Sequence, residues 1–437
     1  MQKSIPGALI VKATIQDPPF NIPGGSGKAY RGIFPGRPLW DTITNSWLFP
    51  QEGAGLMRIS EDLQRIKTRM PVGDNAGGDY TYNIIGAVQN GKCFVTENAR
   101  VGTEYQNRLW KYDIASMVLE QQFKTSHPSQ RIYEVTPLRN GNLAILANGF
   151  AAYTYEVVLL TPNLQVLNSV RIDAYPTAPA NTAQRVRGLS ELIELQSGNL
   201  LLTGYMYDPD YYANTSPVTI EMTPDLVITK TITYGMTYPG GFDEAVEVDG
   251  TVYTVGSVSI SNTRAAFTVA ALKGDASFIR VFTFAGTIAG GGSSRERASV
   301  FYWRGRLYVY TNRNTSDTNP GNASGSGVLM RLNPTDLSLE IARENFITST
   351  ITNSRWTTIE GICVGDRYIV AAQQVSLLCA DADLTNCGTS PNVAVSAVTP
   401  LDSMPVRLQA LNSTFTLDQM TVSTSLSIDT DGMIPAN

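Results

Sequence analysis

Residues 133–146 read YEVTPLRNGNLAIL, and this stretch decides the fold. An apolar strand runs into Asn140-Gly141, and a second apolar strand follows. Asn-Gly between alternating apolar residues is the strongest short-range signal of a β-hairpin, because both residues tolerate a positive φ. The pattern returns at residues 192–202 (LIELQSGNLLL) and 245–255 (AVEVDGTVYTV). Further turns of this kind lie at Asn45, Gly91, Gly305 and Gly365.

A second hairpin follows each first one, with a polar turn that often contains Pro or Asp. Residues 160–164 (LTPNL) and 222–226 (MTPDL) are examples. The positions that follow these turns are Leu63, Met117, Leu164, Leu226, Phe278, Leu337 and Leu384. Two hairpins make a four-stranded antiparallel sheet. Seven tandem units therefore predict an all-β fold, a seven-bladed β-propeller of four-stranded antiparallel blades.

The chain resembles β-propellers as an architecture over residues 39–398, although it lacks the tryptophan-aspartate, kelch and Asp-box signatures of named families. A β-sandwich with a second β domain is the alternative, and seven units in register favour the propeller. Residues 1–38 form an N-terminal arm, in which residues 8–15 (ALIVKATI) predict a strand that could close the ring. Residues 399–437 predict a β-rich C-terminal extension that closes the ring instead or pairs with a neighbouring subunit.

The composition excludes several classes of protein. The 437 residues include 33 Lys+Arg and 38 Asp+Glu, a net charge of −5, which argues against a nucleic-acid partner. No run of 18 apolar residues occurs, so neither a transmembrane helix nor membrane insertion is expected. The N-terminal apolar stretch is too short for a signal peptide. His127 is the single histidine, which argues against histidine metal clusters and a Ser-His-Asp triad.

Charged residues recur at one position of the repeat, near the start of the first strand. Carboxylates at or beside this position are Glu134, Glu191, Asp243 and Glu244, and guanidiniums slightly upstream are Arg131, Arg187, Arg295, Arg297 and Arg355. Because the innermost strand of each blade lines the axis, these groups should converge at one mouth of the channel. Three functions stay open: acid/base catalysis by Glu134, Glu191 and Asp243 with an arginine anion clamp, a cation site, or ion pairs between blades.

A loop at residues 205–214 is rich in tyrosine and aspartate. Its Tyr205, Tyr207, Tyr211 and Tyr212 suit the recognition of sugars or proteins, or the loop packs over its own blade.

The four cysteines fit no zinc-binding spacing. Cys93 and Cys363 lie in apolar strands and are expected to be buried thiols. Cys379 and Cys387 flank a turn and are candidates for a disulfide. No cofactor is expected apart from a structural Ca²⁺ ion.

Low charge, abundant Ser, Thr and Asn, and the C-terminal extension make the chain similar in composition to bacteriophage tail and surface proteins. The leading hypothesis is a non-enzymatic, oligomeric propeller in a virion or at an extracellular surface, reached without a signal peptide. It would present loops to a host glycan or to neighbouring protein subunits of a larger assembly. The alternatives are a hydrolase or lyase that acts on an anionic sugar or lactone, and a cytoplasmic scaffold for protein interactions.

Overall fold

The structure is a computed structural model. It describes residues 11–12, 37–51, 55–60, 66–69, 80–101, 104–128, 130–149, 154–174, 185–207, 215–236, 240–261, 264–284, 298–314, 325–346, 359–366, 369–373, 376–384, 390–406, 408–420 and 422. Strands and turns make up these residues, together with one 3₁₀ helix, η1 (Gly274–Ala276). No helix in this part of the chain is long and apolar enough to cross a membrane.

The strands form antiparallel sheets in chain order. Sheet 1 contains β2 (Leu39–Asp41), β3 (Ser46–Gln51), β4 (Gly55–Ser60) and β5 (Ile66–Arg69). Sheet 2 contains β6 (Tyr80–Gln89), β7 (Lys92–Val101), β8 (Glu104–Asp113) and β9 (Val118–Thr125). Sheet 3 contains β10 (Ile132–Pro137), β11 (Leu143–Asn148), β12 (Tyr155–Leu160) and β13 (Val166–Ala174). Sheet 4 contains β14 (Arg185–Glu194), β15 (Leu200–Tyr207), β16 (Thr215–Met222) and β17 (Ile228–Tyr234).

The pattern continues through the rest of the ring. Sheet 5 contains β18 (Glu244–Val248), β19 (Thr251–Ser261), β20 (Arg264–Leu272) and β21 (Phe278–Phe284). Sheet 6 contains β22 (Ala298–Trp303), β23 (Arg306–Asn314), β24 (Gly325–Leu332) and β25 (Leu339–Phe346). Sheet 7 contains β26 (Ile359–Val364), β27 (Ile369–Gln373), β28 (Ser376–Ala380) and, at its outer edge, β1 (Val11–Lys12). In the last pairing Val11 lies opposite Leu377.

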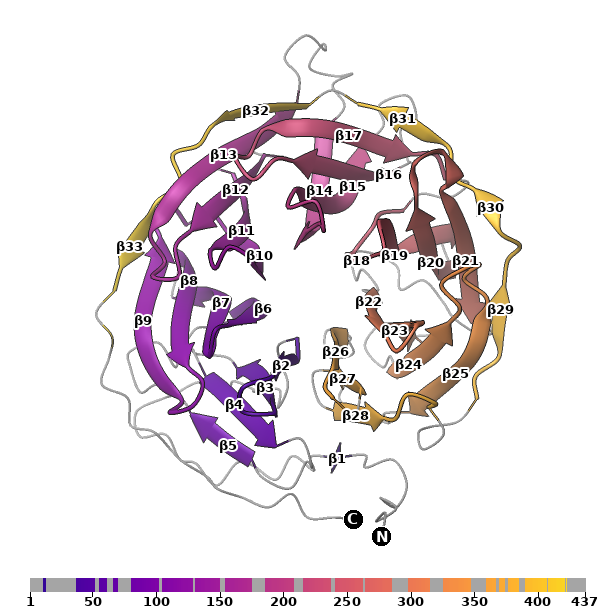
Figure 1. The fold of residues 1–437 in the computed structure, drawn as a ribbon, viewed down its shortest axis with the longest axis horizontal. Helices are drawn as coiled ribbons and strands as arrows, with labels where there is room; N and C mark the ends of the chain where they lie inside the picture. The colour runs from indigo at the N-terminus through magenta and orange to yellow at the C-terminus, as the bar shows by residue number, and fades with distance from the viewer. Residues whose placement is uncertain are drawn as a thin grey trace.

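The sheets stand around a central axis, with the first strand of each sheet innermost (Figure 1). This is a β-propeller, as the repeat predicts. The described strands fall into seven sheets, whereas the ring counts six blades of three to five strands each. The propeller is therefore established, and the predicted number of seven blades is not confirmed.

The first hairpin of each unit turns where the sequence predicts. Asn90 and Gly91 have φ values of 52° and 72°, and Asp249 and Gly250 have values of 49° and 75°. Two consecutive positive φ angles define the type I′ turn, whose twist matches that of the flanking strands. The local turn chemistry thus directs the inner two strands of these sheets.

The second hairpins carry a buried apolar residue in the left-handed region. The residues are Met117, Leu164, Leu226, Leu337 and Leu384, with φ between 52° and 66°. All five are at most 1% exposed. Of the two other positions in the predicted series, Leu63 lies outside the described residues, and Phe278 follows η1, which makes that turn instead.

Each of these five residues, which we call anchors, packs between its own sheet and the preceding one. Leu226, for example, joins a cluster that contains Leu146 of sheet 3 and Leu202 of sheet 4. The left-handed conformation costs a residue with a Cβ about 1–2 kcal/mol. Burial of a leucine side chain contributes about 1.5–3 kcal/mol, so packing between sheets offsets the backbone strain.

The same turns accept hydrogen bonds from the preceding sheet. Arg58 of sheet 1 donates from Nη1 to the Ile114 carbonyl oxygen at 2.9 Å. Farther round the ring, Arg280 Nε donates to the Asp336 carbonyl oxygen at 2.8 Å. An apolar anchor and a bound carbonyl in one turn therefore hold adjacent sheets together.

The C-terminal residues form a strap around the outside of the propeller (Figure 1, yellow). Its strands are β29 (Val393–Val395), β30 (Thr399–Pro400), β31 (Ser403–Pro405), β32 (Leu408–Asn412) and β33 (Leu417–Gln419). The first two pair with β21, and the others pair with β17, β13 and β9 in turn. The described strands of this extension do not join the last sheet to the first, because they cover the outer edges of sheets 5 to 2 of the same chain. Pairing of the extension with a neighbouring subunit stays a prediction.

The strap also fills the gaps between sheets. Leu401 packs with Tyr234 of sheet 4 and Ile279 of sheet 5. Phe415 is 3% exposed and packs in the cluster between sheets 2 and 3. Backbone pairing and apolar residues that enter the gaps between sheets therefore attach the strap.

Substitutions at Leu226 test the left-handed anchor. We expect Leu226→Ala to lower the free energy of unfolding by about 2–5 kcal/mol, as for other buried leucines. Leu226→Gly should be no less stable than Leu226→Ala, because glycine relieves the strain of the positive φ. In the matched strand position, Leu202→Gly should be less stable than Leu202→Ala by about 0.5–1 kcal/mol or more. Denaturant unfolding measures all four, and an equal glycine penalty at both sites would contradict this account.

A substitution in the strap tests its contribution to the fold. Phe415→Ala should lower the free energy of unfolding by about 3–5 kcal/mol, because it empties a buried position between two sheets. Met404→Ala, at a strap position that is 57% exposed, is the matched control and should change it by less than about 0.5 kcal/mol. Equal stability of the two variants would mean that the strap does not fill the gap.

Candidate functional site

Three inner strands place carboxylates toward the central channel. Glu134 is in β10, Glu191 is in β14 and Glu244 begins β18, so sheets 3, 4 and 5 each contribute one. Glu134 and Glu191 are buried, at 8% and 6% exposure. The repeat predicts this convergence, because the three residues lie at nearly equivalent positions of their units.

Arg37 lies between two of these carboxylates. Its Nη1 is 3.5 Å from Glu191 Oε1, and its Nη2 is 3.4 Å from Glu244 Oε2. Arg37 precedes Pro38 and leads into β2, and a residue before proline favours an extended backbone. The guanidinium from the start of sheet 1 thus connects to sheets 4 and 5 across the channel.

The electrostatics of this cluster follow from burial and close approach. Burial opposes the charge of Arg37, but the fields of Glu244, Glu191 and Glu134 together raise the pKa of Arg37 above its ordinary value. Burial, followed by the neighbouring Glu134 carboxylate, raises the pKa of Glu191 well above its usual range, although Arg37 opposes this shift. The channel therefore holds a permanent cation beside a carboxyl group that keeps its proton to higher pH.

Glu244 extends the cluster to the next sheet. Its Oε2 accepts hydrogen bonds from Ser299 Oγ at 2.5 Å and from the Val300 backbone N–H at 3.3 Å. Both donors lie in β22 of sheet 6. One carboxylate therefore connects three sheets through Arg37, Ser299 and Val300, as the interpretation of ion pairs between blades requires.

The other predicted channel residues are placed only in part. Asp243 lies directly before β18, and its N–H donates to the Val255 carbonyl oxygen at 2.7 Å. The Arg131 carbonyl oxygen accepts a hydrogen bond from Asn148 N at 2.8 Å, just before β10. Arg187 is in β14, but its side chain is outside the described part of the structure. Arg295, Arg297 and Arg355 also lie outside the described residues.

Tyr205 lies at the start of the predicted tyrosine-rich loop, near the end of β15. A Cβ atom built on Gly188 would lie 2.0 Å from Tyr205 Cε1, and one built on Gly241 would lie 2.9 Å from Tyr205 Cβ. The tyrosine therefore packs against two glycines rather than extending from a loop. The side chain of Tyr207 and all of Tyr211 and Tyr212 lie outside the described residues.

The two cysteines that the structure describes are free thiols whose pKa values are raised by burial. Cys93 is fully buried, and burial raises its pKa above the ordinary range. Cys363 is partly buried, and burial raises its pKa to about 12. The Cys379 side chain and all of Cys387 lie outside the described residues, so their disulfide stays a prediction. Within the described ranges, no group of three His, Cys, Asp or Glu residues could hold a metal ion.

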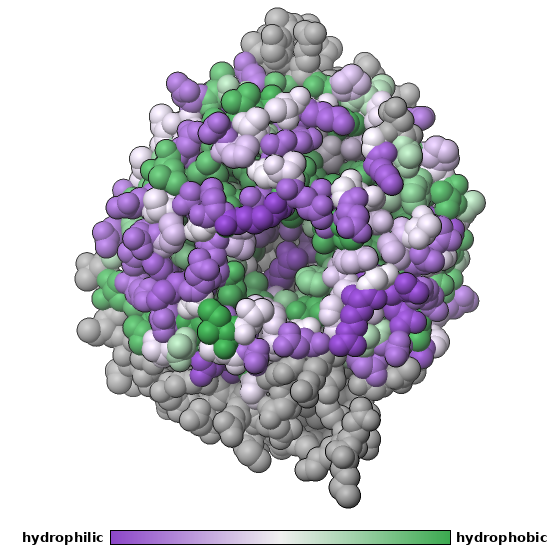
Figure 2. All heavy atoms as spheres, viewed as in Figure 1, coloured by the Kyte–Doolittle hydropathy of each residue, from purple (hydrophilic) through white to green (hydrophobic). Residues whose placement is uncertain are grey.

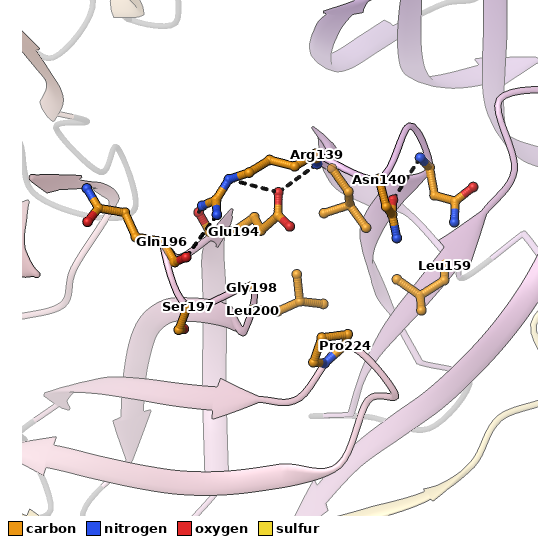
Figure 3. Close-up of a pocket in the computed structure, with 11 residues that line it drawn as sticks. Arg139, Asn140, Leu159, Glu194, Gln196, Ser197, Gly198, Leu200 and Pro224 are labelled. Atoms are coloured by element: carbon orange, nitrogen blue, oxygen red, sulfur yellow. Dashed lines mark hydrogen bonds and ion pairs between the residues drawn. The ribbon is translucent and has the colours of Figure 1, made fainter.

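A second concavity lies between the first-hairpin turns of sheets 3 and 4 (Figure 3). Its volume is about 410 Å³, and its lining includes apolar Leu159, Leu200 and Pro224. Arg139 crosses its rim, donating from N to Glu194 Oε2 at 2.8 Å and from Nη1 to the Gln196 carbonyl oxygen at 3.0 Å. Since these bonds join two sheets, Arg139 contributes to packing at this rim.

The face seen down the propeller axis is hollowed at its centre (Figure 2). Hydrophilic residues lie along one side of the hollow and at its bottom, and apolar residues also border it. The channel region of this face is therefore lined by both polar and apolar groups.

The sequence pattern did not indicate Arg37 or Arg139 as site residues. Arg37 precedes β2 as Arg131 precedes β10, so extending the alignment to the first unit could have found it. The boundary at residue 38 placed Arg37 in the arm instead. Arg139 lies in the turn before Gly141, and nothing in the local pattern indicates the sheet that it reaches.

The sheets and the channel together define the class of the protein as a β-propeller with a central ion-pair cluster. No protein-family model matches the chain, and no curated protein matches it.

Solved structures show distant likeness. One is described as a subtype N10 neuraminidase-like protein of A/little yellow-shouldered bat/Guatemala/060/2010, with 10% identity and a TM-score of 0.42 over 72% of this chain and 95% of that chain. Another is the WD40 domain of SCAP from fission yeast, with 8% identity and a TM-score of 0.32 over 80% and 93%. Neither likeness assigns a role to any residue of the site.

The raised pKa of Glu191 predicts a pH dependence of stability. The folded protein binds this proton more tightly than the unfolded chain, so stability is fully present below the ordinary pKa of 4.5 and falls as pH rises toward the folded pKa. Glu191→Gln should remove this part of the decline. The free energy of unfolding of the variant relative to the natural protein should therefore increase as pH rises from about 4.5 to 8.

Denaturant unfolding at a series of pH values measures this difference. Asp225→Asn, at an exposed turn position, is the control and should follow the natural protein at every pH. A difference between Glu191→Gln and the natural protein that is constant with pH would contradict the assigned shift.

Proposed function

We propose that this protein is a non-enzymatic binding and assembly module, a rigid propeller that presents its faces and outer rim to other molecules. The observation that carries this proposal is the position of Arg37 between Glu191 and Glu244. Glu191, one of the three carboxylates of the enzyme hypothesis, is bound by the chain's own guanidinium, and Glu244, which binds the same guanidinium, also binds sheet 6. Such a cluster favours holding sheets together over turning over a substrate.

Exposed apolar side chains support a binding role. Val118, Val166, Leu167 and Val227 are 42%, 38%, 54% and 58% exposed. They lie at or next to the beginning of β9, β13 and β17, which are equivalent strands of three consecutive sheets. Repeated at the same position of neighbouring sheets, these side chains are available for contact with another protein.

An enzyme is the second candidate, because a buried carboxyl group with a raised pKa in a channel is also typical of an acid catalyst. In that case Glu191 would donate a proton to an anionic sugar or lactone. The arginines predicted at the channel mouth would then hold the anion.

Measurement of turnover separates the two candidates. We expect the purified protein to hydrolyse or eliminate none of a panel of anionic glycosides, uronides and lactones above the rate in buffer. Leu167→Glu, on the exposed rim, serves as a folded control with unchanged thermal stability. Turnover that Glu191→Gln abolishes, without a loss of folding, would overturn the non-enzymatic proposal.

We also propose that each of the seven sheets is a blade, with β1 as the outer strand of sheet 7. The setting that we propose is a virion or extracellular assembly, in which the rim contacts neighbouring subunits or a host glycan. Low charge and the Ser-, Thr- and Asn-rich composition support this setting. Abundance in purified particles, compared with the cytosol, distinguishes it from a cytoplasmic scaffold.

A further inference from the structure

The channel cluster consists of Arg37, Glu134, Glu191 and Glu244. Its carboxylates suit a cation whose hydrogen-bond donors point in two directions, as those of a guanidinium do. Glu191 and Glu244 contact different nitrogens of one guanidinium, and Glu134 adds its field from the neighbouring strand. A guanidinium presents donors in a fixed planar fork, whereas an ammonium is a compact point charge. The two carboxylates are therefore arranged as the two sides of a guanidinium site.

A metal ion does not fit the same carboxylates. Among the residues that the structure describes, no three acidic, histidine or cysteine groups come close enough to hold one ion. A Ca²⁺ ion needs six to eight oxygen atoms at about 2.3–2.6 Å. The described channel carboxylates do not supply that shell.

Arg37 contacts the carboxylates of the site only loosely. Its two contacts of 3.5 and 3.4 Å are longer than the roughly 2.7–2.9 Å of a tight charge-assisted hydrogen bond. The Arg37 side chain is 24% exposed, and that of Glu244 is 17% exposed. Glu191 and Glu244 contact this cation, and the charge of Glu134 also acts on it. Arg37 also lies before β2 rather than within a strand, so its withdrawal breaks no sheet pairing.

We propose that the channel carboxylates form a binding site for an arginine side chain of a partner protein, with Arg37 as the internal competitor that occupies it in the free protein. This inference rests on the proposed binding function and assigns the partner's chemistry at the channel. If Arg37 occupies the site in about nine molecules of ten, it lowers the partner's apparent affinity about tenfold. Removal of Arg37 would restore that affinity.

Rescue with a small cation tests the site. In Arg37→Ala, ethylguanidinium at millimolar concentration should raise the melting temperature, and ethylammonium at equal concentration and ionic strength should not. The double variant Arg37→Ala with Glu191→Gln should lose the response. Equal responses to the two cations, or no response to either, would overturn the guanidinium site.

Peptide binding tests the competition. A fluorescent peptide that carries the chain's own sequence Gly-Arg-Pro-Leu should bind Arg37→Ala at least tenfold more tightly than the natural protein, by fluorescence anisotropy. The same peptide with lysine in place of arginine should not gain. Equal affinity for the variant and the natural protein would overturn the role of Arg37 as a competitor.

A second variant covers the case in which Arg37→Ala does not fold. Arg37→Lys keeps a cation but loses the fork, so the arginine peptide should bind it more tightly than it binds the natural protein. Unchanged binding to a folded Arg37→Lys would overturn the inference. Turnover lost in Glu191→Gln would instead overturn the proposed function, while absent peptide binding in a protein without turnover would overturn this inference alone.

Discussion

The packing of one sheet against the next is the constraint on which the rest of the structure depends. A propeller closes only if each gap between sheets is filled. Here, second-hairpin turns insert an apolar residue such as Leu164 or Leu337, in a backbone conformation that leucine ordinarily avoids. Because burial offsets the strain, the left-handed turn and the packed gap require each other. At the outer rim the strap also packs between sheets, where Leu401 and Phe415 fill the gaps.

At the axis, the channel cluster stabilises the inner strands, where carboxylates of neighbouring sheets lie close together. Inner strands bring carboxylates of neighbouring sheets together, and unpaired buried carboxylates would repel one another. Arg37 supplies the opposite charge from a different part of the ring, and Glu244 extends the network to Ser299. The result links the sheets through the centre while leaving part of the guanidinium exposed. A structural network and a latent binding site are therefore compatible in one cluster.

Local chemistry made much of the fold predictable. Turns such as those at Gly91 and Gly250 have the positive φ values that their sequences require, and the repeat places Glu134, Glu191 and Glu244 on inner strands. The contact between Arg37 and Glu191 spans 154 residues, and no local pattern specifies it. The strap pairs through backbone hydrogen bonds, which any alternating sequence can make. A β-rich extension was therefore predictable, but most of its strands and the edges that they cover were not.

The contact between Arg37 and Glu244 links sheets 1 and 5 across the channel. A double-mutant cycle with Arg37→Met and Glu244→Gln, read by the free energy of unfolding, isolates the energy of that contact from the cost of each substitution. The account predicts a favourable coupling energy of about 0.5–3 kcal/mol that decreases only slightly with salt, because the pair is largely buried. Additive effects within about 0.3 kcal/mol would contradict the claim that this arginine links the sheets across the channel.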